Sequence, residues 1–166
     1  MSKSKIYRMP HPSRATRKVV SRSRASLRGF LIAMLPAFRW PRELHFESEL
    51  EYRFLCLMLI REDIFDIWDQ PTAIKYVGRD GRPASHTFDF LVIMLDGTKV
   101  AVAIKPEDRA ASIGFTEELE LVAQAMPKQF ADQTILVTEN QLNRKAARAA
   151  ARKLAQTRPS LVEEAS

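Results

Sequence analysis

Apolar and polar positions follow two different periods along the chain, and the first clear pattern is helical. Directly after position 48, apolar side chains recur every three or four residues: Leu50, Phe54, Leu57 and Met58. Ser48 and Glu51 stand three residues apart at the start of this pattern and form a capping box, a common signal for a helix start. The pattern therefore predicts a helix that begins after Ser48 and ends near Ile60.

Three segments after this helix have the composition of strands. Their predicted bounds are residues 72–77, 87–95 and 99–104. A run rich in turn-forming residues, 78–81, separates the first two segments. The dipeptide Asp96-Gly97 separates the second and third, and it is the strongest short signal for a β-hairpin. The second and third segments are therefore predicted to pair as antiparallel strands.

Beyond position 106 the chain returns to helical patterns around one further strand. Thr116 can cap a helix whose first turn is acidic, which suits the positive end of the helix dipole. Residues 133–137 are almost all apolar, as expected of a strand covered on both faces. Thr138 and Gln141 form a second capping box before a last helix that ends near position 156. This order of elements predicts an α/β fold with a mixed central sheet flanked by helices.

The first 42 residues show little periodicity and contain four prolines, so they are predicted to form an arm. Within the arm, residues 25–35 are expected to form a short amphipathic helix that docks on the body. The predicted organisation is a basic arm over 1–42, a domain over 43–158 that ends in a basic helix, and a tail over 159–166.

Charge is distributed unevenly along the 166 residues, whose net charge is +6. Residues 1–42 contain eleven Lys or Arg and no acid, and residues 141–160 contain six more and no acid. The part between them carries eighteen of the twenty acids and only nine basic residues. An acidic body between two basic segments suits a protein that binds a polyanion, such as a nucleic acid, with its extensions.

The basic residues expected to contact DNA phosphates are Arg14, Arg17, Lys18, Arg22, Arg24, Arg28, Arg144, Arg148 and Arg152. The last three are spaced four apart and share one helix face. Two alternatives remain open. The charges can belong to a solvated tail and a solvated helix face, and an acid-free arm rich in Arg and Ser also resembles an organelle transit peptide.

The single cysteine, Cys56, lies among apolar residues and excludes an internal disulfide. No apolar run approaches the roughly 20 residues that a membrane span needs. A soluble protein in the bacterial or phage-type cytoplasm is therefore expected.

Asp89 and Lys105 are the first candidates for chemistry. Asp89 lies near the start of the second predicted strand and Lys105 at the end of the third, so the hairpin brings both to the same open end. A carboxylate among apolar neighbours and a nearby ammonium either pair with each other or serve a ligand, since leaving either one desolvated and unpaired is costly. A structural ion pair is the alternative to a functional site, and His86 beside them is read as incidental.

The order of these features resembles the N-terminal domain of TnsA-like endonucleases, within the PD-(D/E)XK nuclease superfamily. The matching stretches are Glu47-Ser-Glu-Leu-Glu51, Asp69-Gln-Pro71, Thr87-Phe-Asp89-Phe-Leu-Val92, Ala103-Ile-Lys105-Pro106 and Thr134-Ile-Leu-Val-Thr-Glu-Asn140. The resemblance covers about residues 43 to 156 and implies a restriction-endonuclease-like core.

The resemblance also implies roles for individual residues. Asp89 matches the central metal-binding aspartate, Glu51 the helix-borne acid, and Lys105 the lysine that assists the attacking water. The implied cofactor is Mg²⁺ or Mn²⁺, held by Asp89, Glu51 and the backbone carbonyl of Ile104. The capping box is the alternative explanation of Glu51.

The chain departs from the family pattern at two positions. Ala103 stands where the second acid belongs, and Phe88 replaces the proline of the usual motif. Two functions follow. The first is a DNA-binding, metal-dependent endonuclease that hydrolyses phosphodiester bonds, with a recombinase or transposase partner by family analogy. The second is a catalytically impaired nuclease fold that acts in DNA binding or complex assembly.

Overall fold

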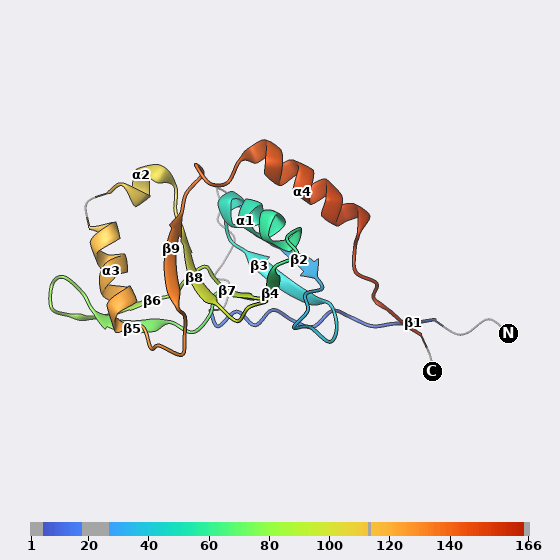
Figure 1. Ribbon diagram of the computed structural model, residues 1–166, viewed down its shortest axis with the longest axis horizontal. Coiled ribbons are helices and arrows are strands. Elements are labelled where there is room, and N and C mark those ends of the chain that lie inside the picture. Colours follow the sequence, from blue (N-terminus) through green and yellow to red (C-terminus); the bar gives the residue numbers. More distant parts are fainter. Residues whose placement is uncertain (1–4, 18–26, 113, 165–166) are drawn as a thin grey trace.

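A computed structural model describes residues 5–17, 27–112 and 114–164. Its centre is a sheet of four strands in the order β4-β7-β8-β9 (Figure 1). Their bounds are Ile64–Asp69 for β4, Phe90–Met94 for β7, Lys99–Ile104 for β8 and Gln133–Val137 for β9. Since β4, β7 and β8 are antiparallel and β9 runs parallel to β8, the sheet is mixed, which confirms the predicted α/β class.

The other elements lie on either side of this sheet (Figure 1). One side carries α1 (Glu49–Leu59), α4 (Arg144–Gln156), and the hairpin of β2 (Gly29–Ala33) with β3 (Arg42–Phe46). The other side carries α2 (Glu107–Ala110), α3 (Phe115–Ala125), and the hairpin of β5 (Ile74–Val77) with β6 (Pro83–His86).

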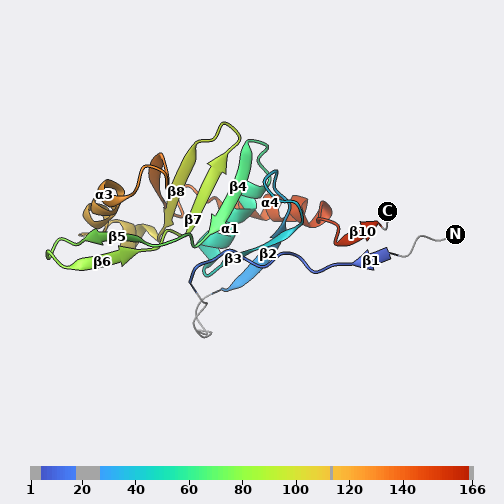
Figure 2. The same cartoon turned by 90° about the horizontal axis from the view of Figure 1, so that it is seen from below.

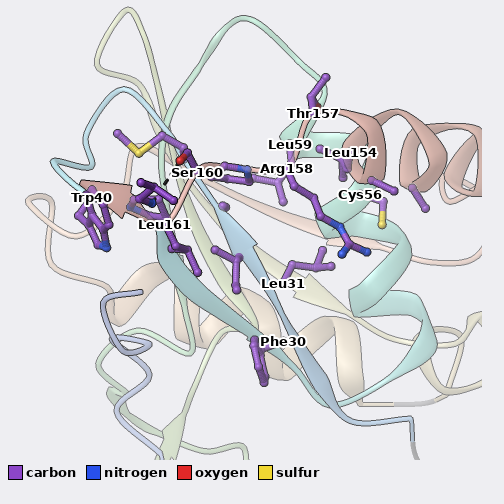
Figure 3. Close-up of a pocket in the computed structure, with 18 of the residues that line it drawn as sticks. Phe30, Leu31, Trp40, Cys56, Leu59, Leu154, Thr157, Arg158, Ser160 and Leu161 are labelled. Carbon is purple, nitrogen blue, oxygen red and sulfur yellow. Dashed lines mark hydrogen bonds between the residues drawn. The ribbon is translucent and has the colours of Figure 1, made fainter. Parts of the chain in front are cut away.

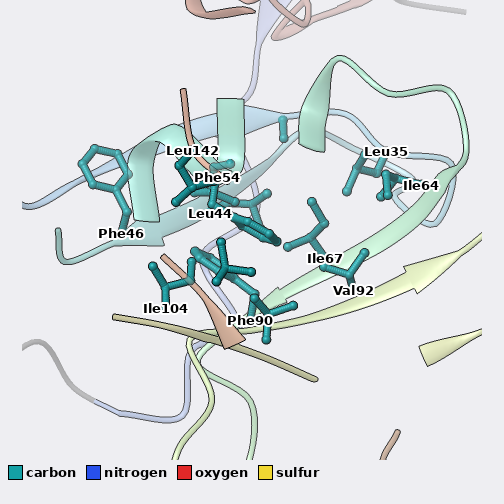
Figure 4. Close-up of a cluster of buried hydrophobic side chains, with 14 of the residues drawn as sticks. Leu35, Leu44, Phe46, Phe54, Ile64, Ile67, Phe90, Val92, Ile104 and Leu142 are labelled. Carbon is teal, nitrogen blue, oxygen red and sulfur yellow. The ribbon is translucent and has the colours of Figure 1, made fainter. Parts of the chain in front are cut away.

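Each side of the sheet has its own hydrophobic cluster. The cluster under α1 includes Leu44, Phe54, Ile67, Phe90 and Ile104 (Figure 4). The cluster under α3 includes Ile74, Phe88, Ala101, Ala103 and Val122. Residues of β8 therefore alternate between the two clusters, as the period of a strand requires.

The amino-terminal segment differs from the predicted arm. The helix expected over residues 25–35 is wrong where the structure describes it, because Gly29–Ala33 is the strand β2. Ala33, Leu35 and Phe38 are buried in the cluster under α1, so this part of the arm contributes to the core of the body. Hydrophobic collapse onto the sheet outweighs a weak local preference for helix.

The two ends of the described chain meet in a small ribbon. β1 (Lys5–Tyr7) pairs antiparallel with β10 (Val162–Glu164), and the ribbon projects from the body along its long axis (Figure 2). Between the ribbon and the body, the chain from 11 to 17 follows the edges of β3 and β4. The Thr16 N–H, for example, donates to the Gln70 carbonyl at 3.0 Å.

Several predicted elements change their bounds. The strand β4 was missed because Asp66 and Asp69 interrupt its apolar pattern. The first predicted strand, 72–77, is the shorter β5, which lies outside the central sheet. The second, 87–95, is shorter at its start, since β7 begins only at Phe90. The third strand and the strand over 133–137 match β8 and β9.

Helix starts and the last strand also need correction. Gly114 precedes α3 in place of Thr116, and Asn143 caps α4 in place of Thr138. The box of Thr138 and Gln141 does form, with the Thr138 N–H donating to Gln141 Oε1 at 2.8 Å, but it closes a turn ahead of the helix. β9 is an edge strand, and Ile135 is 38% exposed, so the expected cover on both faces is wrong.

Candidate active site

The three residues predicted to carry the chemistry lie at the same end of the central sheet. Glu51 lies in the first turn of α1, Asp89 directly before β7, and Lys105 directly after β8. Asp89 is fixed against β8 by two bonds. Its N–H donates to the Val102 carbonyl at 3.0 Å, and its Oδ2 accepts from the Ile104 N–H at 2.6 Å.

Glu51 combines a capping role with a second environment. Its N–H donates to Ser48 Oγ at 3.1 Å, and its carboxylate accepts from the Glu47 N–H at 2.8 Å, so the predicted capping box is confirmed. The residue is only 8% exposed. Burial and then the negative charge of Asp89 raise the pKa of Glu51 to about 7. Helix capping explains the position of the Glu51 carboxylate, but it does not explain why this carboxylate lies near the charge of a second acid, Asp89.

Asp89 shows the same electrostatic imbalance. Burial raises the pKa of Asp89 to about 6, against the opposing effects of the Ile104 N–H and the Lys105 charge. Glu51 is buried and Asp89 is half-buried. Two carboxylates with raised pKa values, close enough to repel, form the arrangement found where an active site holds a cation or moves a proton.

Lys105 lies near Asp89 without touching it. No ion pair within 4 Å joins these two described residues, although the charge of Lys105 lowers the pKa of Asp89. The Lys105 Nζ lies 5.9 Å from the centre of the Phe115 ring. The structural ion pair considered as an alternative is therefore not formed. Lys105 also acts on His86, whose pKa is lowered by burial and by the Lys105 charge, and whose Nε2 is buried without a hydrogen-bond partner.

Ala103 is fully buried on the face of the sheet that α3 covers. It is 0% exposed and belongs to the cluster that contains Phe88 and Val122 under α3. The position that would carry the second acid is thus filled by a small side chain with apolar neighbours. Phe88, the other departure from the motif, is also 0% exposed, so both departures contribute to packing.

The donor set fits a hard divalent cation by type and charge, but it is small. Carboxylate and carbonyl oxygens are the ligands that Mg²⁺ prefers, and a cation would relieve the repulsion between Glu51 and Asp89. Among the residues that the structure describes, no three His, Cys, Asp or Glu side chains are grouped to hold one ion. Two carboxylates and the Ile104 carbonyl are therefore the protein groups available.

No role was predicted for Gln70, whose backbone is hydrogen-bonded to that of Asp89. Its N–H donates to the Asp89 carbonyl at 2.9 Å. Among the described residues other than glycine, Gln70 alone has a positive φ, of 41°. Its side chain is buried, and its Oε1 has no hydrogen-bond partner. Backbone strain of this kind persists where the surrounding structure holds it, and it is common at functional sites.

The residues predicted to contact DNA differ in their burial and in their ion-pair partners. Arg14 pairs with Asp66 at 2.6 Å and is mostly buried, which favours a structural role. Arg17 pairs with Glu47 at 2.6 Å. Lys18, Arg22 and Arg24 lie outside the described residues, and Arg28 is half-buried.

The remaining predicted DNA contacts form the arginine face of α4. Arg144, Arg148 and Arg152 are exposed, whereas Ala147 and Ala150 on the same helix are buried. Arg144 begins this face 3.7 Å from Glu49, in the same helical turn as Glu51. The basic face therefore starts beside the acidic end of the sheet.

A large cavity lies elsewhere. It has a volume of about 920 Å³ and lies between β2, α1, the end of α4 and the segment after it (Figure 3). Its walls include Leu31, Leu59, Leu154 and Arg158, and none of Glu51, Asp89 or Lys105 lines it. The titratable cluster, and not this cavity, is therefore the better candidate for chemistry.

Comparison with known proteins adds no identification. No model of a known protein family matches the chain, and no curated protein is significantly similar to it. Each helix within the described residues is too short or too polar to cross a membrane.

Proposed function

We propose that this chain is a DNA-binding, metal-dependent endonuclease-like protein of the PD-(D/E)XK type, with a TnsA-like, restriction-endonuclease-like core. The observation that carries the proposal is the meeting of Glu51, Asp89 and Lys105 at one end of a mixed sheet, with two raised carboxylate pKa values. This meeting agrees with the resemblance, in which the same three positions match the family's site residues.

Each residue has a distinct task in the proposed reaction. The oxygen of a water attacks phosphorus, the bond to the leaving oxygen breaks, and a proton ends on the released hydroxyl. Mg²⁺ or Mn²⁺, when bound, supplies Lewis-acid stabilisation. The ionised carboxylates of Asp89 and Glu51 would hold the cation. The Lys105 ammonium orients the water and offsets negative charge on the phosphate. Arg144, Arg148 and Arg152 bind flanking phosphates, which positions DNA without reading its sequence.

Cleavage of supercoiled DNA with Mg²⁺ or Mn²⁺ tests the proposal. Asp89→Ala and Lys105→Ala should each lower the rate by at least about a hundredfold. Asp80→Ala and Lys128→Ala change exposed residues of the same types and should leave the rate unchanged. Cleavage that persists in both site variants would contradict the assignment. By family analogy the reaction takes place in the bacterial or phage-type cytoplasm with a recombinase or transposase partner, so the assay is also run with such a protein added.

DNA binding has its own test in the dependence of affinity on salt. Replacing Arg144, Arg148 and Arg152 together by Gln should reduce the log–log slope by about 3, because each contact to a phosphate contributes about 1. Arg79→Gln removes an exposed arginine on the opposite side of the sheet and should leave the slope unchanged. An unchanged slope in the triple variant would remove α4 from the DNA interface.

Ala103 favours a second candidate function, a catalytically impaired nuclease fold that acts in DNA binding or complex assembly. Ala103 is buried among apolar side chains, and in the resemblance it stands at the position of the motif's second acid. This candidate predicts DNA binding with the salt dependence above, but no cleavage with either metal or with an added partner.

A further inference from the structure

The cavity of about 920 Å³ runs along an open edge of the hairpin of β2 and β3, and we call it the β2 groove. Four consecutive residues of β2, 30–33, line it, whereas none of the described residues of β3 does. Successive residues of a strand point to opposite faces, so a hollow that touches all four lies along the edge of the strand. Among the residues that the structure describes, β2 pairs with β3 alone. The backbone N–H and C=O groups of β2 that point away from β3 therefore lack a strand partner.

The walls on either side of this open edge are apolar. Tyr52, Cys56 and Leu59 line the groove from α1, at a spacing that places them on one face of the helix. Leu154 lines it from the end of α4, and Leu161 from the segment that follows α4 (Figure 3). An occupant of the groove would thus meet strand backbone along one side and apolar side chains along the others.

The charged groups of the β2 groove are all of one sign. Arg39 and Arg158 line it, and none of its described lining residues is an acid. Both arginines are exposed, and neither comes within 4 Å of a carboxylate of any described residue. Figure 3 shows Arg158 extending into the hollow from the segment after α4. Two apolar side chains near these cations, Phe30 and Met34, are 52% and 50% exposed. The charge complement of the groove is therefore an acidic group attached to apolar surface.

The open strand edge distinguishes between possible occupants. An acyl chain would fill the apolar space, but it has no groups to pair with the N–H and C=O groups of β2. A second copy of this chain matches the arginines poorly, because its first 42 residues contain no acid. An extended peptide segment with acidic and apolar side chains supplies both the backbone partners and the charge.

We propose that the β2 groove binds an extended, acidic and apolar segment of a partner protein, which adds to β2 as a further strand. Strand addition of this kind takes its affinity from main-chain hydrogen bonds and its specificity from side chains on either face. Because β2 has five residues and spans about 17 Å, the segment has a similar length. Its acidic side chains pair with Arg39 and Arg158. The inference does not depend on the proposed cleavage, since none of Glu51, Asp89 or Lys105 lines the groove.

Fluorescence anisotropy with the full chain measures the charge preference. The probe is a labelled peptide of roughly seven residues in which Glu and Val alternate, and a peptide with Lys in place of Glu is its matched control. The Glu peptide should bind at least about tenfold more tightly, and Arg39→Glu combined with Arg158→Glu should reverse this preference. Arg82→Glu combined with Lys128→Glu makes the same change in net charge at exposed positions outside the groove and should preserve it. Absence of binding by the Glu peptide, or equal binding of both peptides, overturns the inference.

Backbone pairing is tested with N-methylated forms of the Glu peptide. The N–H groups of a strand point alternately to its two edges, so methylation of one alternate set blocks pairing with β2 and methylation of the other set does not. One methylated peptide should therefore bind at least about tenfold more weakly than the other. In NMR hydrogen exchange, the β2 amides that point away from β3 should become protected when the unmethylated peptide binds. Equal binding of the two methylated peptides, or unchanged exchange in β2, contradicts strand addition.

Sedimentation velocity of the chain alone tests the second copy as occupant. A monomer is expected, because the groove is assigned to a different protein. A dimer that the Glu peptide dissociates would assign the groove to a second copy and would overturn the inference.

Discussion

Asp66 lies in β4, and Asp89 directly precedes β7, the strand that pairs with β4. Both lie near a basic side chain, yet their surroundings differ. Asp66 in β4 accepts two bonds from the Arg14 guanidinium, at 2.6 and 3.2 Å, and a third from Trp68 Nε1 at 3.0 Å. The guanidinium also lies 3.7 Å from the centre of the Trp68 ring. The carboxylate of Asp66 is thus fully occupied by protein groups.

Asp89 has much less support. Its Oδ2 accepts a bond from the Ile104 N–H, and Lys105, directly after β8, does not come within 4 Å of it. Burial raises the pKa of Asp89 to about 6, and the charge of Asp89 in turn raises the pKa of Glu51. The difference in partners distinguishes a structural carboxylate, Asp66, from the candidate functional one, Asp89. A buried carboxylate with matched partners stabilises a fold, whereas one without them is available to a ligand.

The largest expected effect comes from breaking the matched pair. Arg14→Met should lower the free energy of unfolding by about 3–5 kcal/mol, because it leaves Asp66 buried without a counter-ion. Urea denaturation followed by circular dichroism measures this change. Arg17→Met is the matched control, since its ion pair is equally short but exposed, and it should cost less than about 1 kcal/mol. Equal costs for the two variants would remove the distinction between the regions.

A carboxylate forced into the apolar side of the sheet should have the next largest effect. Ala103→Glu places an acid among Phe88 and Val122, so we expect a loss of roughly 3 kcal/mol in the free energy of unfolding. Ala111→Glu adds the same charge at an exposed position and should have little effect. If Ala103→Glu is as stable as the unaltered chain and binds Mn²⁺ more tightly, the position belongs to the metal site after all.

The pH dependence of stability tests the unmatched pair. Because folding raises the pKa values of Glu51 and Asp89, their protonated forms favour the folded state. Their contribution is fully present below about pH 4 and is lost as the pH rises through about 6 to 7. Relative to Glu51→Gln with Asp89→Asn, the unaltered chain should lose on the order of 2 kcal/mol per group between pH 4 and 8. A difference that stays constant with pH would show that the two carboxylates do not titrate with raised values.

The smallest expected change in stability is that of Lys105→Met. Among the described residues no acid lies within 4 Å of the Lys105 ammonium. The loss of this group should therefore cost less than about 1 kcal/mol, well below the cost of Arg14→Met. The same variant should raise the pKa of Asp89 further, since the Lys105 charge lowers it. NMR titration of the Asp89 carboxyl group measures that shift, and a large loss of stability would instead assign Lys105 to the fold.

Short-range patterns predicted a substantial part of this structure. The strands at 99–104 and 133–137, the turn at Asp96-Gly97 and the cap of α1 all depend on neighbours in sequence. At Gly97 the φ of 89° shows why this turn needs glycine. The positions of Asp89 and Lys105 at one open end follow from the same hairpin, so the location of the candidate site was also predictable.

Other features depend on residues that are distant in sequence. β4 contains two aspartates that argue against a buried strand, and Arg14, which makes one of them tolerable, lies 52 residues away. The ion pair of Glu47 with Arg17 and the hydrogen bond from Thr16 to Gln70 likewise join residues 30 or more apart in sequence. Such pairings cannot be read from periodicity, because periodicity reports only the local direction of side chains.

The sequence by itself therefore determined the elements with strong local signals, the mixed α/β class and the end of the sheet where acids gather. Only the tertiary structure decided which arginine is mostly buried in its ion pair and which is exposed, and which carboxylates remain without matched partners. The physical reason is that hydrogen bonding and periodicity are local, whereas the pKa of a buried group is set by every charge that the fold brings near it.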